Sequence, residues 1–375
     1  MFKLEQEISL KEWEHQYSAY KIYMDQIIRA SGFKFADLNC KAVQTTECSF
    51  SCDVISGTIN FDLQVLRYFL RINAIIDCKS ELTLPLFEAT TFICFAQELL
   101  NSNISLLSGI AFSLFSDKIL PCMNDPSYWE NFDYRSALEK TRLQAMFLLG
   151  HEVFHLRLSK DPGIRVQYLT ETQELILSTD FPSIISREVI TQITQNESLL
   201  EELACDASSF ETVLDIVPSS ESISFVQVAE SIYAGVLNQF LLLQTKSLAM
   251  AAINDLETST AFIKEQLNYL IIRTQVLNAK VVKVFKMKNF PDDVQLYLEK
   301  SALCYKNWAE STIFHLINTF DQFKDDTLNS RVNDRVLFYM KPEARIEQGE
   351  SVDKIEDIIR RRVLDDWDAF DTINI

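Results

Sequence analysis

Glycine and proline are scarce in this chain, which has only 7 glycines and 8 prolines among 375 residues. Tight turns depend on these two residue types, so their scarcity excludes an all-β sandwich or barrel with many short strands. Uninterrupted apolar runs of about 18 residues are also missing, and we therefore predict no membrane span. The first residues contain no apolar segment of the kind that a signal peptide requires.

Positive charge is in the minority, with 35 Lys and Arg against 53 Asp and Glu and a net charge of −18. Such an acidic balance repels phosphate backbones and anionic lipid surfaces, so we expect no nucleic-acid partner. The eight cysteines form no C-x-x-C pair, and most of them have apolar neighbours. Free thiols in such surroundings are typical of a reducing compartment, so the chain is predicted to be cytoplasmic.

The pattern of apolar residues predicts a mainly helical α+β protein with a small antiparallel sheet near its start. Alternation of apolar and polar residues on both sides of Ser56-Gly57 predicts a β-hairpin across residues 48–66. Segments 67–76 and 82–95 fit either further strands or buried helix, because periodicity does not separate the two. Helices are predicted at residues 4–30, 136–160, 196–217, 224–252, 258–286, 292–322 and 350–368.

The strongest chemical signal is the sequence His151-Glu152-Val153-Phe154-His155, inside the helix predicted from Ser136. Residues four apart lie on one face of a helix, so both imidazoles can bind the same Zn²⁺. Glu152 lies beside the first histidine and can reach a metal-bound water as a general base. With only four histidines in the chain, this arrangement indicates a zinc site rather than a chance pattern.

A catalytic zinc needs a third protein ligand, and no third histidine follows closely. Glu202 and Asp206 instead share one face of the helix predicted over 196–217, within an otherwise apolar stretch. One carboxylate can bind the metal while the other orients a ligand imidazole, and we assign Glu202 to the metal. Glu201 is the competing ligand, but the spacing Ser198-Leu-Leu-Glu201 is that of a helix-capping box.

H-E-x-x-H followed by a helix with E-x-x-x-D resembles the gluzincin class of zinc metallopeptidases. The form E-x-x-x-D-A is closer to Ste24/HtpX-like peptidases and to phage-exclusion Lit-type peptidases than to thermolysin. The resemblance covers residues 136–206 and implies that His151, His155 and Glu202 bind zinc, that Glu152 activates water, and that Asp206 supports a ligand histidine. The 46 residues between His155 and Glu202 are more than the thermolysin arrangement has, and the membrane spans of Ste24/HtpX-like enzymes are missing.

These observations predict a zinc metallopeptidase that hydrolyses peptide bonds of a protein substrate with water activated by Glu152. The alternative is a non-enzymatic helical binding or regulatory protein in which the zinc site is structural or vestigial. The presence of Glu152 favours catalysis, because a purely structural metal has no use for a base. We predict a zincin-like catalytic domain over residues 1–217 and a helical C-terminal domain over 218–375, whose helices would contact a protein partner.

Overall fold

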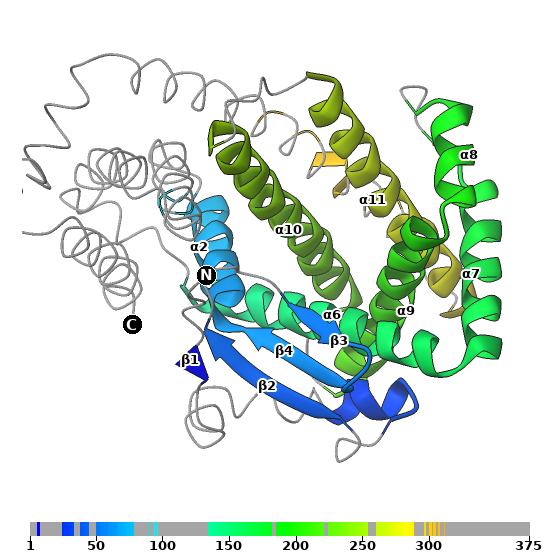
Figure 1. Cartoon of the computed structure of the whole chain (residues 1–375), viewed down its shortest axis with the longest axis horizontal. Helices are drawn as coiled ribbons and strands as arrows, with labels where there is room; N and C mark the ends of the chain where they lie inside the picture. Colours follow the sequence, from blue (N-terminus) through cyan, green and yellow to red (C-terminus); the bar gives the residue numbers. More distant parts are fainter. Residues whose placement is uncertain are drawn as a thin grey trace, which may run out of the picture.

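The computed structural model describes most of the chain between residues 25 and 288 and is mainly helical, with one small mixed sheet in its N-terminal part (Figure 1). The described residues are 6–7, 25–33, 38–44, 50–78, 134–181, 185–220, 224–253 and 260–288, together with 90, 94, 96, 296–297, 300–301, 303–304, 307 and 311. The predicted α+β class with a predominance of helix is therefore confirmed.

The sheet has the strand order β1-β2-β4-β3, formed by β1 (Gln6–Glu7), β2 (Asn39–Gln44), β3 (Ser51–Asp53) and β4 (Thr58–Asp62). The antiparallel pair β3–β4 confirms the predicted hairpin, whose turn uses the positive φ of 66° at Gly57. Its second strand ends at Asp62, so the prediction is wrong for residues 63–66, which are helical. β2 and β4 are parallel, however, so the prediction of a purely antiparallel sheet is wrong. The chain passes through β3 before β4 pairs with β2, and local alternation carries no information about that more distant pairing.

The structure tests three further predictions for the N-terminal part of the chain. Segment 67–76 belongs to the helix α2 (Leu63–Cys78), in which Val65, Phe69 and Ile72 are buried at helical spacing. Residues 90 and 94 of segment 82–95 are helical. The helix predicted over 4–30 is confirmed at 25–30 and wrong at 6–7, which form β1; its other residues lie outside the described ranges.

Helix α6 (Tyr134–Lys160) carries the H-E-x-x-H sequence and ends where we predicted. It begins at Tyr134, two residues before the predicted start at Ser136. Asp161 stops α6 and caps α7 (Pro162–Leu177): its Oδ1 accepts hydrogen bonds of 3.0 Å from the backbone N–H groups of Gly163 and Ile164. Proline at the first helical position completes this start signal.

Helix α8 (Arg187–Gln195) leads directly into α9 (Glu197–Ser220). Asn196 caps α9 by accepting a hydrogen bond of 3.2 Å from the N–H of Leu199, so the predicted capping box at Ser198 is wrong. The helix also continues through Pro218, where we predicted that it would end earlier. In the last turn, a proline removes one hydrogen bond without interrupting a longer helix.

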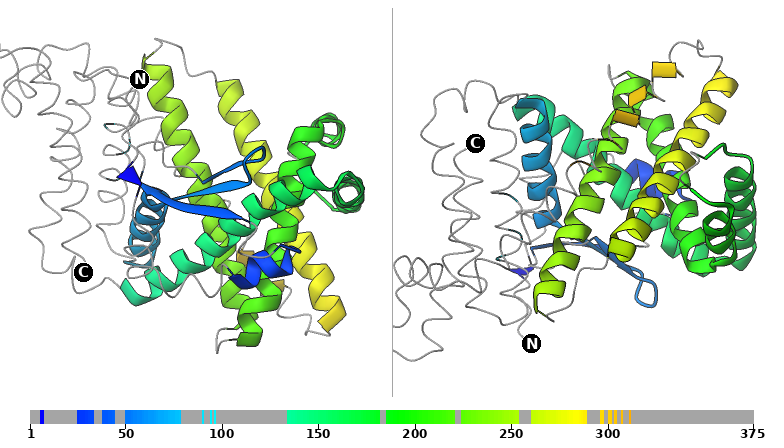
Figure 2. Two further views of the ribbon diagram at one scale, coloured as in Figure 1. Left: turned by 60° about the horizontal axis from the view of Figure 1, so that its bottom comes forward. Right: turned by 90° about the horizontal axis from the view of Figure 1, so that it is seen from above.

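The long helices α10 (Phe225–Ile253) and α11 (Thr260–Lys288) confirm the helices predicted at 224–252 and 258–286. The described positions between 296 and 311 are helical, and segment 350–368 lies outside the described residues. Helix α10 packs on α6 and α9, and α11 packs on α9 (Figures 1 and 2). The boundary between residues 217 and 218 stays a prediction, but α10 and α11 lie directly against the helices that carry the two motifs.

Helix α10 is also the one described helix that is long and apolar enough to cross a membrane, over Phe225–Leu243. Within the protein, 72% of that apolar stretch is buried. Burial of this kind is typical of a core helix, and α10 has that position here, between α6, α9 and α11.

Candidate metal centre

The candidate site forms where α6 and α9 cross at a very short distance. Gly150, the residue before His151, makes this approach possible: a Cβ atom there would lie 2.3 Å from Ser209 Oγ of α9. Ser209 Oγ donates a 2.6 Å hydrogen bond to the Phe147 carbonyl of α6. The crossing therefore brings the first histidine of the motif against the acidic face of α9.

His151, His155 and Glu202 come together at this crossing, and each offers one ligand atom within 4.8 Å of the others. The two Nε2 atoms are 3.0 Å apart, and the Glu202 oxygens lie 3.2 Å from His151 Nε2 and 3.4 Å from His155 Nε2. Two atoms that bind one zinc at 2.0–2.1 Å in a tetrahedron lie about 3.3 Å apart. The three side chains therefore fit a single metal ion, and this cluster could hold one.

Each imidazole also contacts a carboxylate through its other ring nitrogen. His151 Nδ1 lies 2.9 Å from Asp206 Oδ1, and His155 Nδ1 lies 3.2 Å from Glu201 Oε1. An ionised carboxylate only accepts hydrogen bonds, so each Nδ1 carries a proton and Nε2 is the ring atom that faces the ligand cluster. Both rings are thus held in the orientation that suits binding of a metal through Nε2.

Asp206 lies on the Nδ1 side of the His151 ring. The interpretation of Glu201 as a capping residue is wrong. Because Asn196 is the N-cap of α9, Glu201 lies in the second turn, beyond the position from which a side chain reaches back to the cap. Its Oε2 accepts hydrogen bonds of 3.0 and 2.7 Å from Arg165 of α7. Glu201 therefore connects His155 to an arginine.

Arg273 of α11 also belongs to the site, although the sequence gives no sign of it. Its Nε lies 2.6 Å from Asp206 Oδ2, and one terminal nitrogen lies 2.9 Å from Asp206 Oδ1. The same terminal nitrogen donates to Gln239 Oε1 of α10 at 3.2 Å. No local pattern around Arg273 indicates this role, because its partner is 67 positions away in the chain.

The cluster is electrostatically suited to a cation. Burial alone would lower the pKa of His151, but hydrogen bonds to Asp206 and Glu202 raise it to about 10. Burial likewise opposes ionisation of Glu202, yet the two imidazoles hold its pKa well below the usual range. The acids thus stay ionised around the rings, and a divalent cation can take the place of the protons that the metal-free rings hold.

Glu152 is half-buried on α6 and contacts the sheet. Its carboxylate accepts a hydrogen bond from the thiol of Cys52 on β3, and burial together with Glu152 raises the pKa of that thiol to about 12. The thiol therefore remains protonated and acts as a donor. This contact places β3 beside the H-E-x-x-H sequence.

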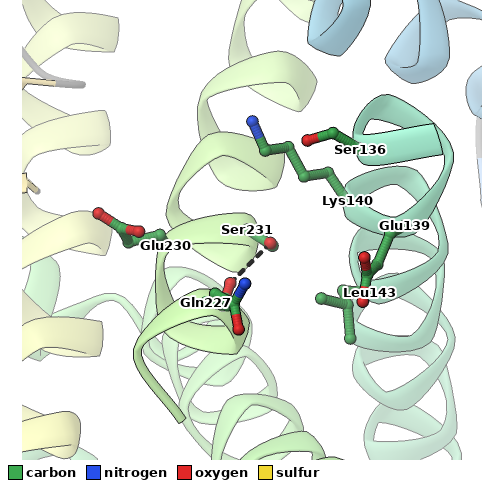
Figure 3. A pocket seen from close by; sticks show the side chains of 7 residues that line it. All are labelled: Ser136, Glu139, Lys140, Leu143, Gln227, Glu230 and Ser231. Carbon is green, nitrogen blue, oxygen red and sulfur yellow. Dashed lines mark hydrogen bonds between the residues drawn. The ribbon is translucent and has the colours of Figure 1, made fainter. Parts of the chain in front are cut away.

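A hollow lies between α6 and α10, about three helical turns before His151 (Figure 3). Its polar lining comes from both helices, and the lining residues are Ser136, Glu139, Lys140, Leu143, Gln227, Glu230 and Ser231. None of the predicted site residues belongs to it, so this hollow is separate from the candidate metal centre.

No protein-family model, no curated protein and no solved structure matches this chain. The fold and the site themselves define its class: a mainly helical protein with a partly buried His-His-Glu cluster on α6 and α9 that could hold a metal ion.

Proposed function

We propose that the protein is a zinc-dependent metallopeptidase that cleaves a protein or peptide substrate. The observation that carries this proposal is the convergence of His151, His155 and Glu202, with Glu152 adjacent on the same helix. Two imidazoles and one carboxylate are a ligand set that zinc accepts in hydrolases, where the fourth position is left for water or substrate. Four protein ligands, often thiolates, are more typical of structural zinc.

When bound, zinc would supply the positive charge that polarises a carbonyl oxygen and acidifies a water molecule. The Glu152 carboxylate accepts the proton from the attacking water and then donates it to the departing amine. The Cys52 thiol, which donates to Glu152, restricts the rotation of this carboxylate. His151, His155 and Glu202 have the remaining role of ligands, and the two carboxylates behind the rings keep Nε2 directed to the ligand cluster.

The sheet supports a peptide as the substrate. β3 is an edge strand, and among the described residues no strand pairs with its outer side. It contacts α6, and Cys52 of β3 touches Glu152. An extended peptide that paired with β3 would therefore run past the proposed base, as in substrate binding by strand addition.

The metal is tested first, by elemental mass spectrometry of the purified full chain after dialysis. We expect about one zinc per chain in the wild type and a loss of zinc in His151→Ala and Glu202→Ala. Glu211→Ala is the matched control, because Glu211 lies on the same helix α9 but pairs with Lys280. A wild type that binds no zinc after reconstitution would overturn the proposal.

The reaction is tested by incubating the zinc-loaded protein with a library of peptides and identifying new termini by mass spectrometry. Glu152→Gln should keep zinc and lose cleavage by a factor of at least about 100, the size of a general-base contribution. Cleavage at the wild-type rate in Glu152→Gln would remove Glu152 from the mechanism. Zinc binding without any cleavage would instead favour the non-enzymatic binding protein.

A further inference from the structure

Each imidazole of the candidate metal centre is connected through a carboxylate to an arginine. The connections are His151–Asp206–Arg273 and His155–Glu201–Arg165. We propose that Arg273 and Arg165 are positioning residues that fix the two carboxylates, and through them the orientation of both histidines toward the metal. This inference rests on the metal site of the proposed function and adds α11 and α7 to that site.

The Arg273 connection is rigid because all of its members are buried. Asp206 is fully buried, and the Arg273 side chain is only 9% exposed. The guanidinium contacts both oxygens of the carboxylate, and such a two-point contact fixes its plane as well as its position. Oδ1 of that fixed carboxylate is the atom that accepts the hydrogen bond from His151 Nδ1. A rotation of the His151 ring would therefore break a buried hydrogen bond to an ionised group.

The Arg165 connection has the same order of groups but is more open. Arg165 donates to Glu201 Oε2, while Glu201 Oε1 accepts from His155 Nδ1 at 3.2 Å. The Arg165 side chain is 35% exposed and also forms an ion pair with Glu197. Water can replace part of this contact, so we expect Arg165 to contribute less to metal binding than Arg273 does.

Holding α11 against α9 does not require Arg273. The two helices share a buried apolar cluster that includes Leu203, Ala207, Ile272 and Val276. Farther along both helices, Lys280 forms an ion pair with Glu211. This ion pair joins the same two helices but lies outside the candidate metal centre. A substitution in it therefore tests helix packing without affecting the orientation of His151.

The test is the affinity of the full-length protein for Zn²⁺, measured by competition with a chelator of known affinity. We expect Arg273→Gln to weaken zinc binding by about 10-fold or more and Arg165→Gln by a few-fold, in line with changes behind metal-ligand histidines. Lys280→Gln, the matched control, should bind zinc as the wild type does. Arg273→Lys keeps the charge but loses the two-point contact, so its affinity should lie between those of Arg273→Gln and the wild type.

A second readout is the exchange of the ring-nitrogen protons in the zinc-loaded protein, followed by ¹⁵N NMR. In the wild type, the Nδ1 proton of each ring should exchange slowly with water; in each arginine variant, the Nδ1 proton of the connected histidine should exchange faster, because its carboxylate partner is no longer fixed. Should Arg273→Gln fail to fold, the partly exposed Arg165 still tests the proposal through His155. Wild-type zinc affinity in both arginine variants would overturn this inference alone, whereas a wild type that binds no zinc would overturn the proposed function as well.

Discussion

The close crossing of α6 and α9 makes Gly150→Ala the sharpest test of how the candidate site is built. An added Cβ would lie 2.3 Å from Ser209 Oγ, 3.1 Å from Ser209 Cβ and 3.4 Å from Ile27 Cγ2. The first two distances are too short, so either the Ser209 side chain or the whole helix must move. Because Gly150 directly precedes His151, a movement of α6 would also separate this histidine from Asp206 and Glu202.

The expected loss of stability follows from three contributions. Overpacking a core position costs about 1–3 kcal/mol. Displacing the Ser209 hydroxyl from the Phe147 carbonyl removes a buried hydrogen bond, for a net cost of about 0.5–1.5 kcal/mol. Replacing glycine by alanine inside a helix recovers about 1 kcal/mol. We therefore expect Gly150→Ala to lower the free energy of unfolding by about 2 kcal/mol.

Urea denaturation of the metal-free protein measures this loss, and zinc titration measures its effect on the site. Ser209→Ala in the Gly150→Ala background removes the 2.3 Å contact and should restore part of the stability, whereas Ser209→Gly also removes the 3.1 Å contact and relieves the remaining crowding. Gly163→Ala is the control, because this helical glycine is exposed and an added Cβ would meet only the side chain of Asp161, at 3.3 Å. If Gly150→Ala proves as stable as wild type and binds zinc equally well, the proposed close approach of the helices is refuted.

Two further predictions concern ionisable groups. Burial opposes protonation of His151, but hydrogen bonds to Asp206 and Glu202 raise its pKa from 6.5 to about 10. In the metal-free protein, the protonated ring therefore adds to the free energy of unfolding. This contribution is complete below pH 6.5 and is lost as the pH rises toward 10. Urea titrations between pH 6.5 and about 7.5, below the range of ordinary thiol ionisation, should show this fall, and a slope unchanged in His151→Gln would contradict it. Iodoacetamide at about pH 8 should alkylate the exposed Cys304 well before Cys52, because burial and Glu152 raise the pKa of the Cys52 thiol to about 12. Mass spectrometry of peptides measures both alkylation rates. Equal rates would refute the burial of Cys52.

The sequence alone was sufficient wherever short-range chemistry decides the structure. The spacing of His151 and His155 puts both rings on one helix face, and the same rule puts Glu202 and Asp206 on one face of α9. Asp161-Pro162 ends one helix and starts the next, because the aspartate caps the new helix and proline fits its first position. The hairpin turn at Gly57 follows from glycine's tolerance of positive φ.

Only the tertiary structure decided which of these faces meet and what lies behind them. Alternation in β2 and β4 does not reveal that the two strands are parallel, because pairing depends on the path of the intervening chain. The capping pattern at Ser198 misassigned Glu201, whose carboxylate joins Arg165 to His155. Arg273 reaches Asp206 from another helix, and a contact across 67 positions leaves no periodic signal in either helix. Helix periodicity is set by neighbours within one turn, whereas the candidate metal centre depends on how α6, α7, α9 and α11 pack against one another.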